Sequence, residues 1–159
     1  MSGYIEYIRG LIGKKPVIMV SVAVLVIDGQ NRCLLIRNKW GSKESEIWAV
    51  PGGFMEMGET TEETARREIK EETGLEIGRL KLVTVLSQKE VGTLPNGDQL
   101  YPVTIVYLSK DIIGGELKPD NSEVCEAKFF PFTDLPKMNP DIKRQLELFA
   151  NLAEKWGVF

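Results

Sequence analysis

Residues 53–75 read GFMEMGETTEETARREIKEETGL, and no other stretch constrains so strongly what this chain can fold into. Aliphatic Ile69 and Leu75 stand where a helix would have to face a core. Glycine and charged residues fill seven further positions at fixed spacing: Gly53, Glu59, Arg67, Glu68, Glu71, Glu72 and Gly74. Since each residue type makes up only about 5–7% of ordinary chains, a chance match is rarer than roughly one in a million. The spacing therefore indicates a functional motif.

The middle of this stretch predicts a helix with defined ends. Thr60 and, three residues later, Glu63 form a capping box, which starts a helix at about Thr61. The helix should continue to Thr73, because Gly74 is free to adopt the left-handed conformation that ends a helix. The motif is therefore expected to be a loop followed by a helix.

Three glutamates lie on one side of this helix. Glu68, Glu71 and Glu72 share an arc of about 100°. Like-charged pairs at this spacing each cost about 0.2–0.5 kcal/mol even when they are exposed. A solvated acidic face, neutralised by neighbouring basic side chains, is the ordinary interpretation of an isolated acidic helix. The fixed spacing of Gly53 and Glu59 instead favours a site for a hard divalent cation such as Mg²⁺, which prefers oxygen ligands.

The residues before the helix suit a phosphate site. Pro51, Gly52 and Gly53 allow a tight turn that presents bare amides and carbonyls to a ligand, although a Gly-Gly pair alone is usually only a turn. Trp48 is a candidate to stack on a base, but a tryptophan here more often packs in a core. Arg37, at the end of an expected strand, is the better candidate for contacting phosphate, although most such cations are simply solvated.

The motif resembles that of the Nudix hydrolases at every defined position from 53 to 75, and the Trp-x-x-Pro-Gly-Gly lead-in agrees with it. The resemblance implies an α/β/α sandwich with a mixed β-sheet between helices. It also implies Mg²⁺-dependent hydrolysis of a diphosphate linkage in a nucleoside diphosphate derivative, such as a nucleoside triphosphate or ADP-ribose, by a water that the cation activates. The alternative is a catalytically silent Nudix-like module that binds a nucleotide as a sensor.

The resemblance assigns a role to each motif residue. Mg²⁺, or Mn²⁺ in its place, would be bound by Glu68, Glu71, Glu72 and the carbonyl of Gly53. The expected catalytic residues are Glu68, Glu71 and Arg67, with Arg67 orienting Glu59. Which glutamate is the general base stays open between Glu68 and Glu71, with Glu123 as a candidate from a loop outside the motif. Supporting positions are Glu59, Gly52 and Gly74, and the candidate substrate contacts are Arg37, Trp48 and Glu123.

Composition excludes several other chemistries. The chain has no histidine, which excludes a Ser-His-Asp triad and a Cys-His nucleophile, and argues against Nudix-type isomerases that relay protons through histidine. A net charge of −3 gives no electrostatic footprint for duplex nucleic acid, so the expected partner is a small nucleotide-type substrate. Cys33 and Cys125 lack metal-ligand spacing and are interpreted as structural thiols of a reducing compartment.

Residues downstream of the motif leave the substrate open. About 15 residues past Leu75, ADP-ribose hydrolases of this family would show a proline, but Glu90 and Val91 stand there. Diadenosine polyphosphate hydrolases would show a tyrosine 16–18 residues past it, where Val91, Gly92 and Thr93 stand.

The 159 residues predict a single domain spanning 1–159, with helices over 1–13 and 139–156. Strands are expected over residues 17–28, 32–38, 79–92, 99–109 and 125–131. A hairpin is expected through residues 29–31, followed by a polar loop from residue 39, and another hairpin through Asn96-Gly97. The most apolar run, Val17 to Ile27, is too short to cross a bilayer, so a cytoplasmic protein without membrane contact is expected. A homodimer through the terminal helices is a further hypothesis.

Overall fold

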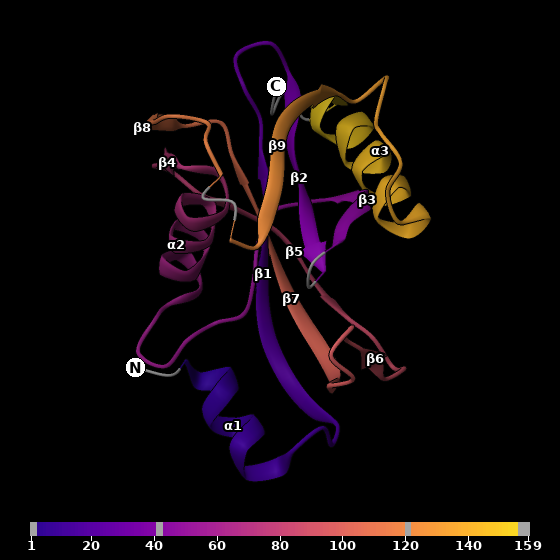
Figure 1. Cartoon of the computed structure of the whole chain (residues 1–159). Helices are drawn as coiled ribbons and strands as arrows, with labels where there is room; N and C mark the ends of the chain where they lie inside the picture. The colour runs from indigo at the N-terminus through magenta and orange to yellow at the C-terminus, as the bar shows by residue number, and fades with distance from the viewer. Residues whose placement is uncertain (1–2, 41–42, 120–121, 156–159) are drawn as a thin grey trace.

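The computed structural model describes residues 3–40, 43–119 and 122–155, and Figure 1 shows how the helices and strands are arranged. The helices are α1 (Tyr4–Ile12), α2 (Thr61–Thr73) and α3 (Pro140–Lys155). The strands are β1 (Val17–Val26), β2 (Arg32–Trp40), β3 (Lys43–Ala49), β4 (Leu75–Ile77), β5 (Lys81–Ser87), β6 (Gly92–Thr93), β7 (Gln99–Ser109), β8 (Ile112–Gly115) and β9 (Val124–Pro131).

The strands form three sheets. A mixed sheet has the order β1-β7-β5, with β6 pairing on β7. In it β1 runs parallel to β7, whereas β5 and β6 run antiparallel to β7. A second, antiparallel sheet has the order β3-β2-β9, and β4 pairs with β8 in the third. Parallel strands need a long crossover connection, and the crossover from β1 to β7 contains α2 and the loop before it.

Alternate residues of β1 serve the two sides of the molecule, because successive strand side chains point to opposite faces. Val24 and Val26 belong to the core cluster that contains Ile69 of α2. Leu25 belongs to a second cluster, which contains Leu146 of α3. Figure 1 shows α2 and α3 on opposite sides of the strands. The α/β/α sandwich with a mixed sheet, predicted from the sequence, is confirmed.

The hairpin predicted between β1 and β2 is wrong, although its turn forms. The amide of Asp28 donates to the carbonyl of Arg32 (3.0 Å), and Asn31 has a φ of 58°. Between the two strands, however, the ladder is limited to one antiparallel bridge, Ile27 to Cys33. β1 then pairs with β7, and β2 pairs with β3 and β9. A turn sequence determines where the chain reverses, but packing determines which strand becomes the partner.

Of two further expectations, the turn between β6 and β7 is confirmed and the polar loop after β2 is wrong. The turn at Asn96-Gly97 is confirmed: the amide of Leu94 donates to the carbonyl of Asp98 (2.9 Å), Gly97 has a φ of 85°, and β6 pairs with β7. The polar loop predicted from residue 39 is mostly strand, since β2 continues to Trp40 and pairs with β3. Residues 41–42 lie outside the described residues. The sequence did not predict the short strands β4 and β8.

The terminal helices lie within the predicted ranges. The side-chain oxygen of Asn139 accepts from the amides of Asp141 (2.9 Å) and Ile142 (3.4 Å), which caps α3. Residue 156, in which the predicted C-terminal helix ends, lies outside the described residues. Across the described part of the chain, every helix is too short or too polar to span a membrane. Cys33 and Cys125 are free thiols, and burial raises the pKa of Cys33 to about 12.

Candidate active site

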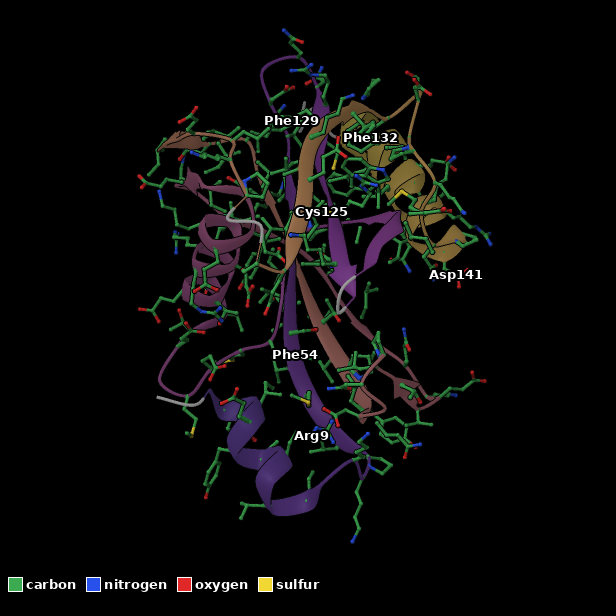
Figure 2. All side chains as sticks on the ribbon, viewed as in Figure 1. Arg9, Phe54, Cys125, Phe129, Phe132 and Asp141 are labelled. Carbon is green, nitrogen blue, oxygen red and sulfur yellow. The ribbon has the colours of Figure 1, made fainter. Side chains whose placement is uncertain are left out.

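Residues 51–55 run along the edge of β1 as an extended segment. The amides of Val24 and Val22 donate to the carbonyls of Pro51 (2.9 Å) and Gly53 (2.8 Å), and the amide of Met55 donates to β1 in return (3.1 Å). Figure 2 shows Phe54 from this segment beside β1. Pro51 and Gly53 therefore direct their carbonyls toward β1, and the residue between them faces the other way.

That intermediate residue, Gly52, faces helix α2. Its amide donates to Glu72 Oε2 at 2.8 Å. The Gly53 carbonyl, which the family resemblance assigned to a metal ion, is instead occupied by the amide of Val22. In an extended chain the N–H and C=O of one residue point to the same side, so the carbonyl of Gly52 belongs to the side on which Glu72 lies.

Both glycines are required by close contacts. At Gly52, which has a φ of 152°, an added Cβ would lie 2.1 Å from the carbonyl oxygen of Val22. At Gly53 an added Cβ would lie 2.3 Å from Glu68 Oε1. The backbone of β1 therefore limits the first position, and the carboxylate of α2 limits the second.

Helix α2 begins and ends as the sequence predicts. Thr60 and Glu63 form both bonds of the capping box: the Glu63 amide donates to Thr60 Oγ1 (3.2 Å), and the Thr60 amide donates to Glu63 Oε2 (2.7 Å). Gly74 ends the helix with a φ of 78°. Ala65 and Ile69 are fully buried, so their face of α2 packs against the strands, and the adjacent arc with Glu68 and Glu72 lies toward the loop.

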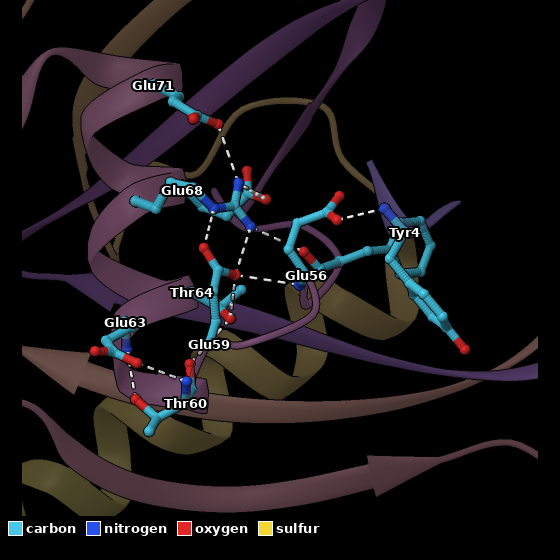
Figure 3. Close-up of polar contacts among 10 residues, drawn as sticks. Tyr4, Glu56, Glu59, Thr60, Glu63, Thr64, Glu68 and Glu71 are labelled. Atoms are coloured by element: carbon cyan, nitrogen blue, oxygen red, sulfur yellow. Dashed lines mark hydrogen bonds and ion pairs between the residues drawn. The ribbon is translucent and has the colours of Figure 1, made fainter. Parts of the chain in front are cut away.

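Arg67 is the centre of a network of carboxylates, of which Figure 3 labels Glu59, Glu68 and Glu71. Its Nε donates to Glu59 Oε1 at 2.6 Å, and its Nη2 donates to the carbonyl of Phe54 at 3.0 Å. Its Nη1 donates to Glu68 Oε1 (2.8 Å) and to Glu71 Oε2 (3.1 Å). The arginine therefore ties the loop before α2 to two of the motif glutamates, as the sequence predicted for Glu59.

Glu59 is almost fully satisfied by hydrogen bonds. Besides Arg67, its carboxylate accepts from Thr64 Oγ1 (2.9 Å) and from the amide of Glu56 (3.1 Å). The hydrogen bond from Arg67 lowers the pKa of Glu59 to about 2, and the same bond raises the pKa of Arg67. This pair stays charged at every ordinary pH.

Glu68 and Glu72 have the opposite surroundings. Burial is the main reason why the pKa of Glu72 rises to about 8, and the charges of Glu68, Glu123 and Glu71 add to the effect. Burial also raises the pKa of Glu68, although Arg67 partly offsets it. Half-buried carboxylates that face one another without sufficient positive charge are unfavourable unless a cation or a proton joins them.

The oxygen atoms of Glu68, Glu72 and Gly52 suit a hard cation, although the carboxylates do not converge on one point. Glu68 and Glu72 supply oxygens from one face of α2, and Gly52 faces Glu72 from the loop. Within the described residues, no group of three acidic or thiol side chains converges as a ready-made cation site. The reason lies in Arg67, which holds Glu68 and Glu71, and the Glu71 side chain is 59% exposed. An oxygen-only set of ligands fits Mg²⁺.

A cavity of about 360 Å³ opens beside the glycine loop. Its walls come from β1, the segment containing Gly52, Gly53 and Phe54, and the hairpin formed by β6 and β7. The lining residues are Ser21, Val22, Val50, Gly52, Gly53, Phe54, Gly92, Thr93, Leu94, Leu100 and Pro102. A larger apolar groove of about 630 Å³ continues between the mixed sheet and α3, and it shares Val50 and Pro102 with the cavity.

Comparison with known proteins agrees with this geometry. The profile described as the NUDIX domain matches residues 17–151. The chain belongs to the Nudix family. It is 41% identical to a protein named ADP-ribose pyrophosphatase from Methanocaldococcus jannaschii, over 71% of this chain and 62% of that protein. It is 32% identical to NAD-capped RNA hydrolase NudC from Vibrio atlanticus, over 77% of this chain and 42% of that protein. The chain therefore spans only 42–62% of the length of these relatives.

Solved Nudix structures share the fold. The crystal structure of a MutT NUDIX hydrolase from Burkholderia pseudomallei superposes with a TM-score of 0.64 at 28% identity, covering 84% of this chain and 97% of that one. A mutator MutT protein from Bacillus halodurans superposes with a TM-score of 0.66 at 21% identity, covering 82% of this chain and 80% of that one.

Of the three candidate residues outside the motif, Arg37 and Trp48 contact other side chains, and Glu123 lies near the acidic cluster. Arg37 forms an ion pair with Glu126 (2.8 Å) and lies over the ring of Trp48 at 5.9 Å. Trp48 packs edge-on against Phe130, with ring centroids 4.7 Å apart, so it has the core role that was its simpler interpretation. Glu123 precedes β9 and lies close enough to raise the pKa of Glu68 and Glu72. It is the candidate outside the motif that the fold brings to the site.

The sequence pattern outside the motif did not indicate which residues line the cavity. Ser21 and Phe54 both line it and are bridged to one another, and Thr104 of β7, which lines the neighbouring groove, shares a hydrogen bond of 2.9 Å with Ser21. These residues are far apart in the chain and stand outside the motif, apart from Phe54. The alternation of β1 was the one signal that could have placed Ser21 on the face opposite Val22.

Proposed function

We propose that this Nudix chain hydrolyses a diphosphate linkage in a nucleoside diphosphate derivative and requires a divalent cation. The observation that carries the proposal is the position of Glu68 and Glu72. Both carboxylates are partly buried and lie against Gly53 and Gly52 in the wall of a cavity, and Arg67 offsets the charge of Glu68 only in part. Catalysis on phosphate anions needs such a negatively charged, cation-binding edge next to a substrate cavity.

Glu68, Glu72 and the carbonyl of Gly52 would hold Mg²⁺ or Mn²⁺, with Glu71 contributing to the same acidic cluster. Gly52 replaces Gly53 in this proposal, because the Gly53 carbonyl is hydrogen bonded to β1. When bound, the cation neutralises phosphate charge and lowers the pKa of a water that attacks phosphorus. Gly52 and Gly53 let the substrate approach the backbone closely.

Arg67 has a positioning role in this proposal. It fixes Glu68 and Glu71 through one nitrogen and is itself fixed by Glu59. A carboxylate must accept the proton of the attacking water. Glu68, Glu71 and Glu123 are the candidates, and they differ in surroundings: Glu68 is tied to Arg67 and half-buried, whereas Glu71 and Glu123 are exposed. Conservative Gln variants at the three positions would separate them by their pH–rate profiles.

The cavity favours the nucleoside end of the substrate. Its lining is apolar or hydroxyl-bearing and contains no charged side chain among the described residues, so it suits a base and ribose better than a phosphate. ADP-ribose comes first among the candidate substrates, since a relative at 41% identity has the name ADP-ribose pyrophosphatase. Nucleoside triphosphates come next. We also propose that the substrate is a small molecule, that the chain acts in the cytoplasm, and that it forms a homodimer.

A product assay tests this function. The intact chain is incubated with Mg²⁺ and, separately, with ADP-ribose, nucleoside triphosphates, nucleotide sugars, NADH, dinucleoside polyphosphates and an NAD-capped RNA. We expect one compound to be cleaved far faster than the rest, no cleavage in EDTA, and recovery with Mg²⁺ or Mn²⁺. Glu62→Gln, on an exposed part of α2, is the matched control for Glu72→Gln. Tight binding of one compound without cleavage would instead support the sensor.

A further inference from the structure

Helix α1 lies outside the part of the chain that matches the Nudix profile, yet it contacts the loop and the hairpin whose neighbouring residues form two walls of the cavity. The profile begins at residue 17, whereas α1 ends at Ile12. One end of α1 meets the loop that precedes α2, and the other end meets the hairpin of β6 and β7. Gly52 and Phe54 from the first wall, and Thr93 and Leu94 from the second, line the same cavity.

The first contact is made by Glu56. Its carboxylate accepts from the amide of Tyr4 at 2.5 Å, as the dashed line in Figure 3 shows. Gly3, at the N-cap of α1, has no side chain to do this, so Glu56 supplies the missing cap and a negative charge at the positive end of the helix. The amide of Glu56 donates in turn to Glu59, the partner of Arg67. The N-terminus of α1 is therefore linked to Arg67 through three successive hydrogen bonds.

The second contact is made by Arg9, which Figure 2 places between α1 and the strands. Its Nη2 donates to the carbonyl of Gln99 at 2.9 Å, and its Nε lies 3.4 Å from Asp98 Oδ2. The side chains of Arg9 and Asp98 are only 11% and 13% exposed. Just beyond α1, Lys14 Nζ donates to the carbonyl of Asn96 (2.7 Å), in the turn of the same hairpin. An arginine whose side chain is mostly buried, and which contacts both a carboxylate and a backbone carbonyl, holds its neighbours in place more firmly than a surface ion pair does.

We propose that α1 is a strap that holds the two walls of the cavity at a fixed separation, with Arg9 and Glu56 as positioning residues. Arg9 sets the place of the hairpin wall, which the nucleoside end of the substrate would contact. Glu56 sets the place of the loop wall and, through Glu59, the orientation of Arg67. The strap determines the positions of the two walls, and the kinetic effects expected from it rest on the proposed hydrolase function.

The kinetic test separates the two anchors. Arg9→Ala should raise KM about tenfold while kcat changes by less than about threefold, because the hairpin wall acts on binding. Glu56→Ala should lower kcat about tenfold or more through Glu59 and Arg67. Glu56→Gln keeps a neutral acceptor for the Tyr4 amide and should recover part of that loss. Arg79→Ala, at a side chain that is 94% exposed, is the charge-matched control for Arg9→Ala and should leave both constants unchanged.

Amide hydrogen exchange tests the strap without any need for turnover. Arg9→Ala should speed exchange in residues 92–99, and Glu56→Ala should speed it in residues 53–59 and 4–8, compared with wild type and Arg79→Ala. Arg9→Lys, which retains the charge opposite Asp98, should give a smaller increase and serves if Arg9→Ala does not fold. Unchanged exchange at both walls in folded variants would overturn the strap. A wild type that cleaves none of the substrates would overturn the hydrolase proposal alone, since the exchange result still decides the strap.

Discussion

Glu59 and Glu72 stand just before and near the end of the same helix, and their surroundings are opposite. Glu59 accepts from Arg67, Thr64 and a backbone amide, and its pKa falls to about 2. Glu72 accepts from the amide of Gly52 but faces other carboxylates, and its pKa rises to about 8. The hydrogen bonds of Glu59 therefore stabilise the N-terminal end of α2, whereas the half-buried carboxyl of Glu72 beside the cavity lowers the stability of the C-terminal part. Such a conflict between stability and charge is typical of functional sites.

The largest expected effect is on turnover at the unbalanced end. Glu72→Gln and Glu68→Gln should each lower kcat by about 100-fold or more, because they remove cation-binding charge without changing side-chain volume. Steady-state assays on the substrate found in the panel measure this, with Glu62→Gln as control. Wild-type rates in both variants would show that the C-terminal part of α2 is not the active site.

The two glycines should respond differently to the same substitution. Gly52→Ala should destabilise the fold by about 3 kcal/mol or more, because its Cβ would meet the backbone of β1 at a strained φ. Gly53→Ala meets only the carboxylate end of Glu68, which can move, so it should fold but lose about 10–100-fold in turnover. Urea unfolding and steady-state kinetics on both variants check this. Equal stability losses would contradict the distinction between a rigid and a movable neighbour.

In the absence of metal, the loss of folding stability should be larger for Glu59→Gln than for Glu72→Gln, which is the opposite of the order expected for turnover. At pH 7, Glu59→Gln should lower the free energy of unfolding by about 1–3 kcal/mol, because it leaves Arg67 without its main partner. Glu72→Gln should leave stability unchanged or raise it, since burial raises the pKa of Glu72 to about 8 and folding at pH 7 must therefore protonate this carboxyl. Urea unfolding in EDTA measures both. A larger loss for Glu72→Gln than for Glu59→Gln would break the comparison.

The pH dependence of Glu59 gives a smaller effect with a defined sign. Its pKa is lowered in the folded state, so its contribution is complete above the unfolded value of about 4.5 and is lost as pH falls toward 2. The stability difference between wild type and Glu59→Gln should therefore be constant from pH 7 to about 5 and shrink below that. Thermal unfolding at a series of pH values measures it. A difference that instead grows on acidification would mean that Glu59 does not form this ion pair.

The sequence predicted the parts of this molecule that local chemistry determines. The capping box at Thr60, the end of α2 at Gly74 and the turn at Asn96-Gly97 all depend on neighbours within a few residues, and each forms as predicted. The bond between Arg67 and Glu59, which the family resemblance implied, also joins residues on and just before one helix.

The rest depends on contacts between distant segments. The carbonyl of Gly53 points at β1 because residues 51–55 pair with that strand, and no local pattern shows this pairing. The hairpin ladder predicted through residues 29–31 does not extend beyond its turn for the same reason. β1 pairs with β7, and β2 pairs with β9, instead of with each other. Arg37 is directed to Glu126 and Trp48 by the pairing of β2 with its two neighbours. The hydrogen bond between Ser21 and Thr104 forms because β1 and β7 are parallel neighbours in register.

The central claim is that the unbalanced glutamates bind a divalent cation, and calorimetric titration of the metal-free protein with Mn²⁺ tests it most directly. Wild type and Glu62→Gln should bind Mn²⁺ with the same affinity, and Glu72→Gln should bind it at least about tenfold more weakly. Equal binding by Glu72→Gln and wild type, or no binding by either, would contradict the account.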